Sequence, residues 1–301
     1  MEIELRRPEL GDRDLINSYL QNTDTRSCEM TFANIYLWSR HYHTGFAVVE
    51  DMLVFGNTAG EIAFTVPVGS ADLKRAVDAL MGYCEEKGVP FQLYNVTRED
   101  FARLESLYPG ELEISYERDY ADYVYEAEKL ATLSGKKYHS KKNHVNQFKR
   151  AYPNWSYEPI TKENVEECFQ MGLRWRELNG CEADPEKHAE ICVALNFLRL
   201  FEELEMRGGL LRVDGQVVAF TIGEPVGKKR DTLVVHIEKA FSEVQGAYTM
   251  INQQFAEHEG KGFLYMNREE DVGDEGLRQA KMSYKPVFLI EKGVVRKRTL
   301  L

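Results

Sequence analysis

The sequence predicts a mixed α/β protein with two domains. The chain has 301 residues, about twice the length of a common domain. Hydrophobic residues make up 43% of it, enough for a buried core in each half. Segments with helical spacing alternate with short strand-like segments, and the second half repeats the order of the first. We therefore expect an N-terminal domain at residues 1–125 and a C-terminal domain at residues 126–301.

Helices and strands alternate along the first half. The expected elements are a helix at 12–23, a hairpin at 46–56, a strand at 61–66, a helix at 71–87, a strand at 90–96 and a helix at 98–107. Leu73 and Val77 lie on the apolar face of the second helix, and the hairpin turns at Glu50 and Asp51. We expect residues 118–135 to join the two halves.

The second half begins with two helices and then alternates in the same way. The expected elements are a helix at 162–178, a helix at 185–207, a hairpin at 209–222, a strand at 232–239, a helix at 246–259, a strand at 262–267, a helix at 274–281 and a strand at 286–291. Asp214 and Gly215 in the hairpin form the strongest turn signal in the chain. This order resembles that of a GNAT acyltransferase domain, whose mixed sheet splits where an acyl carrier binds.

The charge and the apolar runs limit the expected partners and location. The formal net charge of −11 disfavours non-specific binding to nucleic acid or to an anionic membrane. The apolar runs are too short to span a bilayer, and the N-terminus lacks the basic-then-apolar order of a signal peptide. We expect a cytoplasmic protein with at most peripheral membrane contact, and the oligomeric state stays open.

The cysteines and histidines show no pattern typical of a metal site. The five cysteines contain no CxxC pair, so we expect reduced, partly buried thiols. The seven histidines show no ligand spacing. No metal site is predicted.

A basic segment at residues 134–150 contrasts with the acidic chain. It holds six Lys or Arg residues and two His residues but no acidic residue, and Ser134 is expected to cap its helix. A helix face with one sign of charge indicates phosphate binding, and a solvated or internally paired face is the alternative. The expected phosphate ligands are Lys136, Lys137, Lys141, Lys142, Asn143, His144 and Arg150.

A second segment, at residues 239–252, joins a predicted strand to a predicted helix. At this place in a GNAT domain, a glycine-rich turn directs backbone N–H groups at the pyrophosphate of coenzyme A. Gln245 and Gly246 fit that pattern, whereas Tyr248 is bulky where a small residue is usual. We expect Gln245, Gly246, Tyr248 and Asn252 to contact substrate, and an ordinary helix start is the alternative.

A third segment, at residues 267–286, follows a strand at the edge of the sheet where ligands of open α/β sheets bind. The carboxylates expected to be catalytic are Glu269, Asp271 and Glu275. Arg278 and Lys281 lie about one turn apart on the next helix, and together with Tyr284 they are expected to bind substrate. A polar loop with internal ion pairs is the alternative.

Residues 31–38, 133–144 and 267–278 resemble a bacterial family known as DUF2156. That family is grouped with the C-terminal domain of phosphatidylglycerol lysyltransferase, and the resemblance spans nearly the whole chain. It implies two tandem GNAT-like domains with α+β mixed sheets, a fold shared with the Fem-type peptidoglycan aminoacyltransferases. Related members move an aminoacyl group from charged tRNA to a lipid hydroxyl or a peptide amine. The long transmembrane region of the lysyltransferase has no counterpart in this sequence.

The resemblance implies a transferase. Its donor would be aminoacyl-tRNA or an acyl-coenzyme A, and its acceptor a lipid, a peptide or a small molecule. The basic segment would hold donor phosphates, the three carboxylates would recognise an amino group or deprotonate the acceptor, and Arg278 and Lys281 would bind an anionic group. Two alternatives stay open: a non-catalytic ligand- or tRNA-binding module, and a coenzyme A-dependent N-acetyltransferase. The sequence indicates no cofactor beyond these donor substrates.

Overall fold

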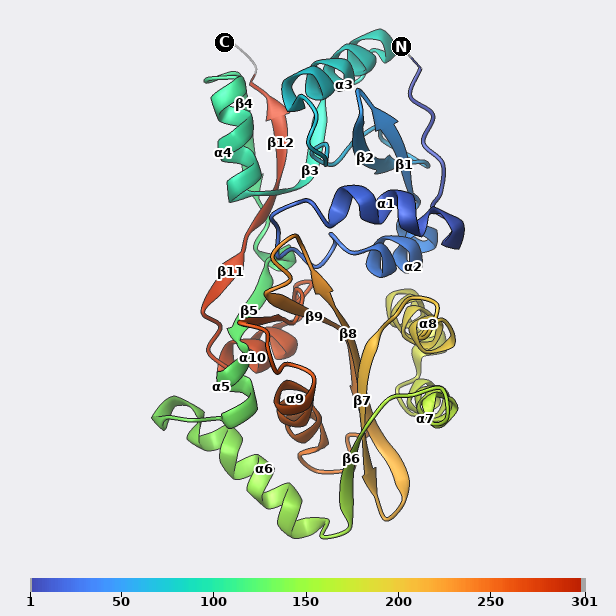
Figure 1. Ribbon diagram of the computed structural model, residues 1–301, viewed down its shortest axis with the longest axis vertical. Coiled ribbons are helices and arrows are strands. Elements are labelled where there is room, and N and C mark those ends of the chain that lie inside the picture. Colours follow the sequence, from blue (N-terminus) through green and yellow to red (C-terminus); the bar gives the residue numbers. More distant parts are fainter. Residues whose placement is uncertain (1, 299–301) are drawn as a thin grey trace. The chain divides into compact units, whose positions relative to one another are not determined.

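The computed structural model describes residues 2–298 and divides them into two compact units (Figure 1). The first unit contains residues 2–122, 270–275 and 289–298, and the second contains residues 123–269 and 276–288. The units are therefore not consecutive halves of the sequence. The chain first crosses from one unit to the other between residues 122 and 123, near the expected domain boundary at 125/126.

The described part of the first unit contains helices and two small antiparallel sheets. Its helices are η1 (Leu10–Asp12), α1 (Arg13–Leu20), α2 (Phe32–Tyr42), α3 (Leu73–Lys87), α4 (Arg98–Leu107) and η2 (Arg118–Tyr120). The first sheet pairs β1 (Thr44–Val49) with β2 (Met52–Asn57). The second has the order β3 (Gln92–Thr97), β12 (Lys292–Lys297) and β4 (Leu112–Tyr116). The apolar face of α3 packs into the core of this unit.

Local signals account for these boundaries. Glu50 and Asp51 have φ angles of 50° and 59°, which suits the two-residue turn between β1 and β2. The side chain of Asp72 caps α3 by accepting hydrogen bonds from its first N–H groups. Gly88 ends the same helix with a left-handed φ of 67°.

Within residues 2–298, the second unit carries a seven-stranded sheet with helices on both faces (Figure 1). The strand order is β11 (Phe288–Ile290), β5 (Asp122–Glu126), β10 (Tyr265–Asn267), β9 (Thr232–Ala240), β8 (Gln216–Val226), β7 (Arg207–Val213) and β6 (Trp155–Pro159). β10 is parallel to β9, whereas β8 is antiparallel to both of its neighbours. The sheet is thus mixed, as predicted.

The helices of the second unit divide between the two faces of the sheet. They are α5 (Ala127–Thr132), η3 (Lys136–Tyr138), α6 (His139–Ala151), α7 (Val165–Leu178), η4 (Cys181–Ala183), α8 (Pro185–Arg199), α9 (Ala247–His258) and α10 (Glu275–Ser283). α9 covers one face of β7, β8 and β9, and α7 and α8 lie on the other face (Figure 1).

A bulge interrupts β9 near its middle. Ile222 pairs with Ile237 and Gly223 with Val235, so His236 is the extra residue of the bulge. Gly223 allows this geometry because a Cβ at its position would lie 2.1 Å from the carbonyl oxygen of Val234. Bulges bend a strand and redirect its side chains, and they are common beside active sites.

Both predicted hairpins and the helices from α7 to α10 are confirmed, with differences at the ends. α8 ends at Arg199 rather than at residue 207, because the chain turns there and Glu205 has a left-handed φ of 55°. Ser134 does not cap α6. That helix begins at His139, after η3, and its N-cap Tyr138 makes no side-chain capping bond.

The predictions were wrong where short strands lie beside charged or proline residues. The expected strand at 61–66 does not form; Phe64 makes isolated bridges, and Pro67 provides no N–H to extend a ladder. The expected joining segment at 118–135 instead contains β5 and α5. The elements β4, β6, β12 and α2 were not predicted.

We expect Gly223→Ala to destabilise the protein, because the added Cβ would clash with the carbonyl oxygen of Val234 in the neighbouring strand. The free energy of unfolding should fall by about 2 kcal/mol or more, measured by urea denaturation. Gly82→Ala is the control: no atom lies within 4 Å of its added Cβ on α3, and alanine usually stabilises a helix by about 0.5–1 kcal/mol. Equal effects of the two substitutions would contradict a requirement for glycine at the bulge.

Candidate functional site

The bulge in β9 holds a buried imidazole between two carboxylates. The Nδ1 atom of His236 lies 2.7 Å from a carboxylate oxygen of Glu269, and Nε2 lies 3.1 Å from one of Glu224. The side chain of His236 is 1% exposed, whereas those of Glu224 and Glu269 are 16% and 19% exposed. The ring of Phe197, from α8, stacks on the imidazole. The imidazole is therefore fixed, while both carboxylates keep access to solvent.

The two carboxylates control the charge of this imidazole. Burial alone would lower the pKa of His236, but hydrogen bonds to Glu224 and Glu269 and the charges of these residues raise it to about 9. At neutral pH the ring is protonated and donates one hydrogen bond from each nitrogen.

The backbone also positions Glu269. Its φ of 56° lies in the left-handed region, which is uncommon for a residue other than glycine. Its N–H donates to the side-chain oxygen of Asn267 at 2.8 Å, and its carbonyl accepts from the N–H of Tyr123 at 3.1 Å. These bonds hold the turn after β10 that presents Glu269 to His236.

A second polar cluster lies two residues further along β9, at Glu238. One carboxylate oxygen accepts from Nη2 of Arg268 at 2.9 Å, and the other accepts from Nδ2 of Asn252 at 3.1 Å. Among the described residues, the buried atoms Nη1 of Arg268 and Oδ1 of Asn252 have no hydrogen-bond partner. Buried polar atoms are nearly always paired, so these two atoms are candidates for hydrogen bonds to a polar ligand group.

A cavity of about 540 Å³ lies at the start of α9. It is lined by residues 241–242 and 244–249 and by His144, Gln147 and Ala151 of α6. Gly246 has a φ of 85°, a left-handed backbone conformation that residues with a side chain rarely adopt. The first N–H groups of a helix attract anions, so this cavity suits a phosphate or carboxylate.

The structure brings together two of the three segments that the sequence analysis singled out. His144 of the basic segment lines this cavity together with Gln245, Gly246 and Tyr248. Asn252 lies deeper in α9 and binds Glu238. The other predicted phosphate ligands do not line the cavity: Lys136, Lys137, Lys142, Asn143 and Arg150 are exposed, and Lys141 packs over the ring of Tyr284.

The predicted carboxylates have different surroundings. Glu269 joins His236 in the second unit. Asp271 belongs to the first unit and is fully buried, where Arg118 donates to it at 3.3 Å and the N–H of Gly273 donates at 3.0 Å. Glu275 is exposed at the first residue of α10. The partners of Asp271 assign it to the local fold of the first unit.

The predicted cations and the tyrosine after the turn also differ in exposure. Lys281 is buried and donates to the carbonyl oxygen of Arg268 at 2.7 Å, so it holds the turn between β10 and α10. Arg278 is half-buried on α10, and Tyr284 is buried under Arg268 and Lys141. Tyr284 is therefore the member of this group that lies beside the Glu238 cluster.

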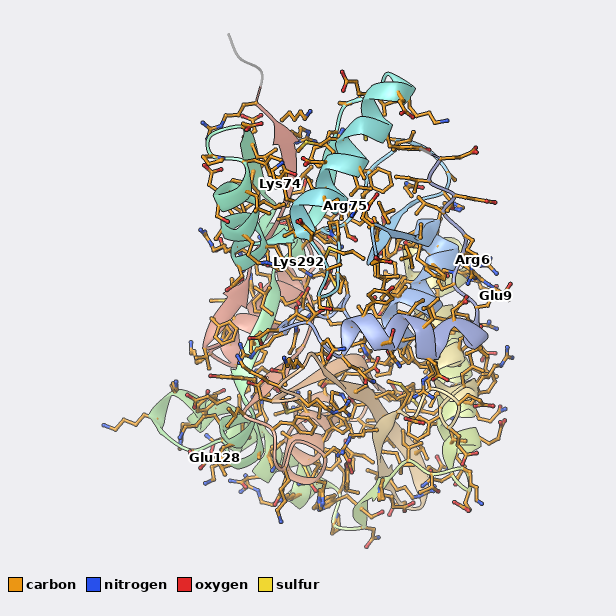
Figure 2. All side chains as sticks on the ribbon, turned by 45° about the horizontal axis from the view of Figure 1, so that its top comes forward. Arg6, Glu9, Lys74, Arg75, Glu128 and Lys292 are labelled. Carbon is orange, nitrogen blue, oxygen red and sulfur yellow. The ribbon has the colours of Figure 1, made fainter. Side chains whose placement is uncertain are left out.

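The first unit contains a buried ammonium group on β12. Lys292, labelled in Figure 2, is 1% exposed and lies 2.6 Å from a carboxylate oxygen of Asp122 and 3.9 Å from one of Glu270. It also pairs with Glu29, and Cys28 donates its backbone N–H to Asp122. Burial opposes the charge of Lys292, but Asp122 and its neighbours raise its pKa well above the usual value.

The same cluster has the residue types of a metal site. Ligand atoms of Cys28, Glu29, Asp122 and Glu270 lie within 4.8 Å of one another. The ammonium of Lys292 lies among them and supplies the positive charge that these carboxylates require. Burial raises the pKa of the Cys28 thiol, which disfavours the thiolate that would bind a metal. We therefore interpret this cluster as structural.

Sequence reasoning missed the other members of the two clusters that contain Glu269 and Asn252. These residues are His236, Glu224, Glu238 and Arg268. A signal was present: His236 and Glu238 are polar residues inside an otherwise apolar strand, and a buried polar residue usually has a specific partner. Their partners come from strands distant in sequence, so the pairs themselves could not be read from the chain.

We expect stability to depend on pH through His236. A pKa raised from 6.5 to about 9 stabilises the folded protein fully below pH 6.5, and this contribution is lost as the pH rises through about 9. Urea denaturation should show a loss of about 3 kcal/mol across this window. His236→Gln should flatten the dependence, and an equal slope in that variant would assign the effect to other groups.

Removing the ammonium of Lys292 should destabilise the first unit. Lys292→Met leaves the fully buried carboxylate of Asp122 without its cation, which typically costs about 3–5 kcal/mol. Lys74→Met is the matched control, because Lys74, labelled in Figure 2, is exposed on α3 and pairs with the exposed carboxylate of Asp78. The control should lose less than about 1 kcal/mol in the same unfolding measurement. Similar losses would show that the buried cluster is not structural.

Within residues 2–298, no helix combines the length and the apolar character needed to cross a membrane.

Solved structures resemble this chain over almost its full length. A conserved protein of unknown function from Bacteroides thetaiotaomicron VPI-5482 is 38% identical, and the match covers 99% of this chain and 100% of that chain with a TM-score of 0.91. L-PGS from Bacillus licheniformis is 15% identical, with coverages of 98% and 94% and a TM-score of 0.66. FemX is 10% identical, with coverages of 98% and 96% and a TM-score of 0.60. The GNAT-like fold expected from the sequence is thereby confirmed.

Sequence comparison identifies the family. A curated relative, the uncharacterized protein MYCGA3080 of Mycoplasmoides gallisepticum, is 24% identical over 188 residues. That match covers 62% of this chain and 59% of the relative's length. Residues 21–295 match the family model described as phosphatidylglycerol lysyltransferase, C-terminal. The chain therefore belongs to the family of the phosphatidylglycerol lysyltransferase C-terminal domain.

Proposed function

We propose that the chain is an aminoacyltransferase that moves an aminoacyl group from a charged tRNA to an acceptor hydroxyl or amine. The observation that carries this proposal is the imidazole of His236, held between the carboxylates of Glu224 and Glu269 at the bulge of β9. Family membership supports the reaction class, because the family's name describes transfer of a lysyl group to a phospholipid. A lipid, a peptide and a small molecule are all acceptors of suitable chemistry.

The reaction needs a group that accepts and returns a proton. The acceptor oxygen or nitrogen attacks the ester carbonyl, the bond from that carbonyl to the ribose oxygen breaks, and the ribose hydroxyl leaves. The ester is already activated, so the enzyme has to align the nucleophile and move one proton. We assign this proton transfer to Glu269, which pairs with His236 at 2.7 Å and has access to solvent. Glu269 takes the proton of the acceptor and returns it to the ribose oxygen.

The remaining site residues divide between binding and local structure. The cavity at the start of α9 and the predicted phosphate ligands of the basic segment would hold donor phosphates. The carboxylate of Asp271 is occupied by Arg118 and by a backbone N–H, which supports a structural role. We assign recognition of the substrate to Glu275 and Arg278, which lie on α10.

An acyl-coenzyme A donor is the second candidate, and one observation favours it. The cavity lies at the start of α9, where GNAT enzymes place a pyrophosphate. Tyr248, bulky where a small residue is usual, lines that cavity and is 40% exposed. Competitive binding of coenzyme A would favour this donor over tRNA.

The test is discharge of aminoacyl-tRNA. The purified protein is incubated with a mixed pool of labelled aminoacyl-tRNAs, with and without a cell lipid extract, and the loss of label from tRNA is measured. We expect accelerated discharge and transfer of label to one product class. Glu269→Gln should slow the discharge by about 10²–10⁴-fold, the usual contribution of a general base.

Glu128→Gln is the matched control for that substitution. Glu128 is an exposed glutamate at the start of α5 in the same unit, and it is labelled in Figure 2. The control should discharge aminoacyl-tRNA at the wild-type rate. No discharge by the wild type would contradict the proposal and favour coenzyme A or a binding role. Full activity of Glu269→Gln would contradict the role of Glu269 as the general base but not the transfer reaction itself.

A further inference from the structure

Two cations share one buried aromatic ring beside the Glu238 cluster. The Nζ atom of Lys141, on α6, lies 4.1 Å from the centre of the Tyr284 ring. The guanidinium carbon of Arg268 lies 4.9 Å from the same centre. Tyr284 is 5% exposed. The ring therefore brings two positive charges, from distant parts of the sequence, into one partly desolvated place.

The formal charges of the side chains around the Tyr284 ring do not cancel. Glu238 pairs with Arg268 at 2.9 Å. Lys141 has no carboxylate partner among the described residues, and burial and the charge of Arg268 both lower its pKa. Two cations and one carboxylate leave an excess of one positive charge. Like charges held together at a partly buried site favour binding of an anion between them.

A hydrogen-bond donor is also available at the same place. The buried Nη1 atom of Arg268 has no partner among the described residues, whereas Nη2 is used by Glu238. A guanidinium is a planar donor that suits the oxygens of a phosphate or a carboxylate. An incoming oxyanion would therefore find the Nη1 amino group of Arg268 and the ammonium of Lys141.

We propose that Lys141, Arg268 and Tyr284 bind one phosphodiester group of the single-stranded 3′ end of the tRNA donor. This inference rests on the proposed function and adds a defined subsite to it. A phosphodiester carries one negative charge and neutralises the excess, whereas a doubly charged phosphate monoester would leave a net negative charge.

The rest of α6 favours a polynucleotide over a lipid headgroup. The helix has 13 residues and is about 20 Å long. Further exposed cations lie on both sides of Lys141, namely Lys137, Lys142 and Arg150. A row of cations suits successive phosphates of one strand, whereas a lipid headgroup presents a single phosphodiester. His144, one turn after Lys141, also reaches the cavity at the start of α9.

The test compares two small probes without an aminoacyl group. The trinucleotide CCA represents the 3′ end of tRNA, and glycerophosphoglycerol represents a lipid headgroup. Dissociation constants are measured by titration calorimetry at several salt concentrations. Lys141→Gln should weaken trinucleotide binding about tenfold. The slope of log affinity against log salt should fall by about 0.7, the value for one lost phosphate contact on a single strand.

Lys149→Gln is the matched control. Lys149 lies on the same helix, and its ammonium lies 5.2 Å from the centre of the Trp155 ring. The substitution therefore removes the same charge and the same kind of ring contact, away from Arg268. It should change trinucleotide affinity less than about twofold. Thermal unfolding of both variants checks that each is folded.

Two outcomes would overturn the inference. Equal effects of Lys141→Gln and Lys149→Gln on affinity and salt slope would show that no specific subsite exists. Loss of glycerophosphoglycerol binding with unchanged trinucleotide binding would assign the site to a lipid headgroup. Failure of the proposed function would give a different result. If trinucleotide binding depends on Lys141 but the protein does not discharge aminoacyl-tRNA, the subsite stands and the proposed transfer reaction is rejected.

Discussion

The bulge at His236 is the constraint on which the candidate site depends. In a regular strand, residues two apart face the same side of the sheet. His236 and Glu238 are two apart, yet His236 stacks against Phe197 of α8, and Glu238 binds Asn252 of α9 on the other face. The extra residue in β9 makes this possible, and Gly223 in β8 leaves the space for it. One local irregularity thus directs two charged clusters from one strand to both faces.

The buried charges of the two units differ in how completely they are paired. In the first unit, Lys292 has several carboxylate partners, so its desolvation is compensated within the fold. In the second unit, Arg268 keeps one buried N–H group without a partner among the described residues, and Lys141 has no carboxylate partner there. Unused capacity for hydrogen bonds and charge indicates a place where a ligand completes the structure. This contrast is the reason for assigning stability to the first cluster and binding to the second.

Much of the fold could be predicted from the sequence. The turns at Glu50 and at Asp214 are local signals, and the spacing of apolar residues marks the long helices without tertiary information. β5 was missed because its short apolar run lies between Asp122 and Glu126 and resembles a charged connector. A strand of this kind is stabilised mainly by its neighbours in the sheet, which a single sequence does not show.

The candidate site could be predicted less completely. Glu269, His144 and Gly246 were found because they lie in segments with unusual composition or a turn pattern. His236 was missed because the bulge depends on the pairing of two strands, and its charge depends on Glu224 and Glu269, which come from other strands or turns. Arg268 was within a recognised segment, but only the structure shows that it shares the Tyr284 ring with Lys141.

The most direct test of this division between reaction and binding is steady-state kinetics of aminoacyl-tRNA discharge for the wild type, His236→Gln and Lys141→Gln. An interaction used in the chemical step changes kcat, whereas one that only binds the donor changes KM. We predict that His236→Gln lowers kcat with little change in KM, and that Lys141→Gln raises KM with little change in kcat. The same pattern in both variants, or no change in either, would contradict the assignment of the reaction to the bulge of β9 and of donor binding to α6.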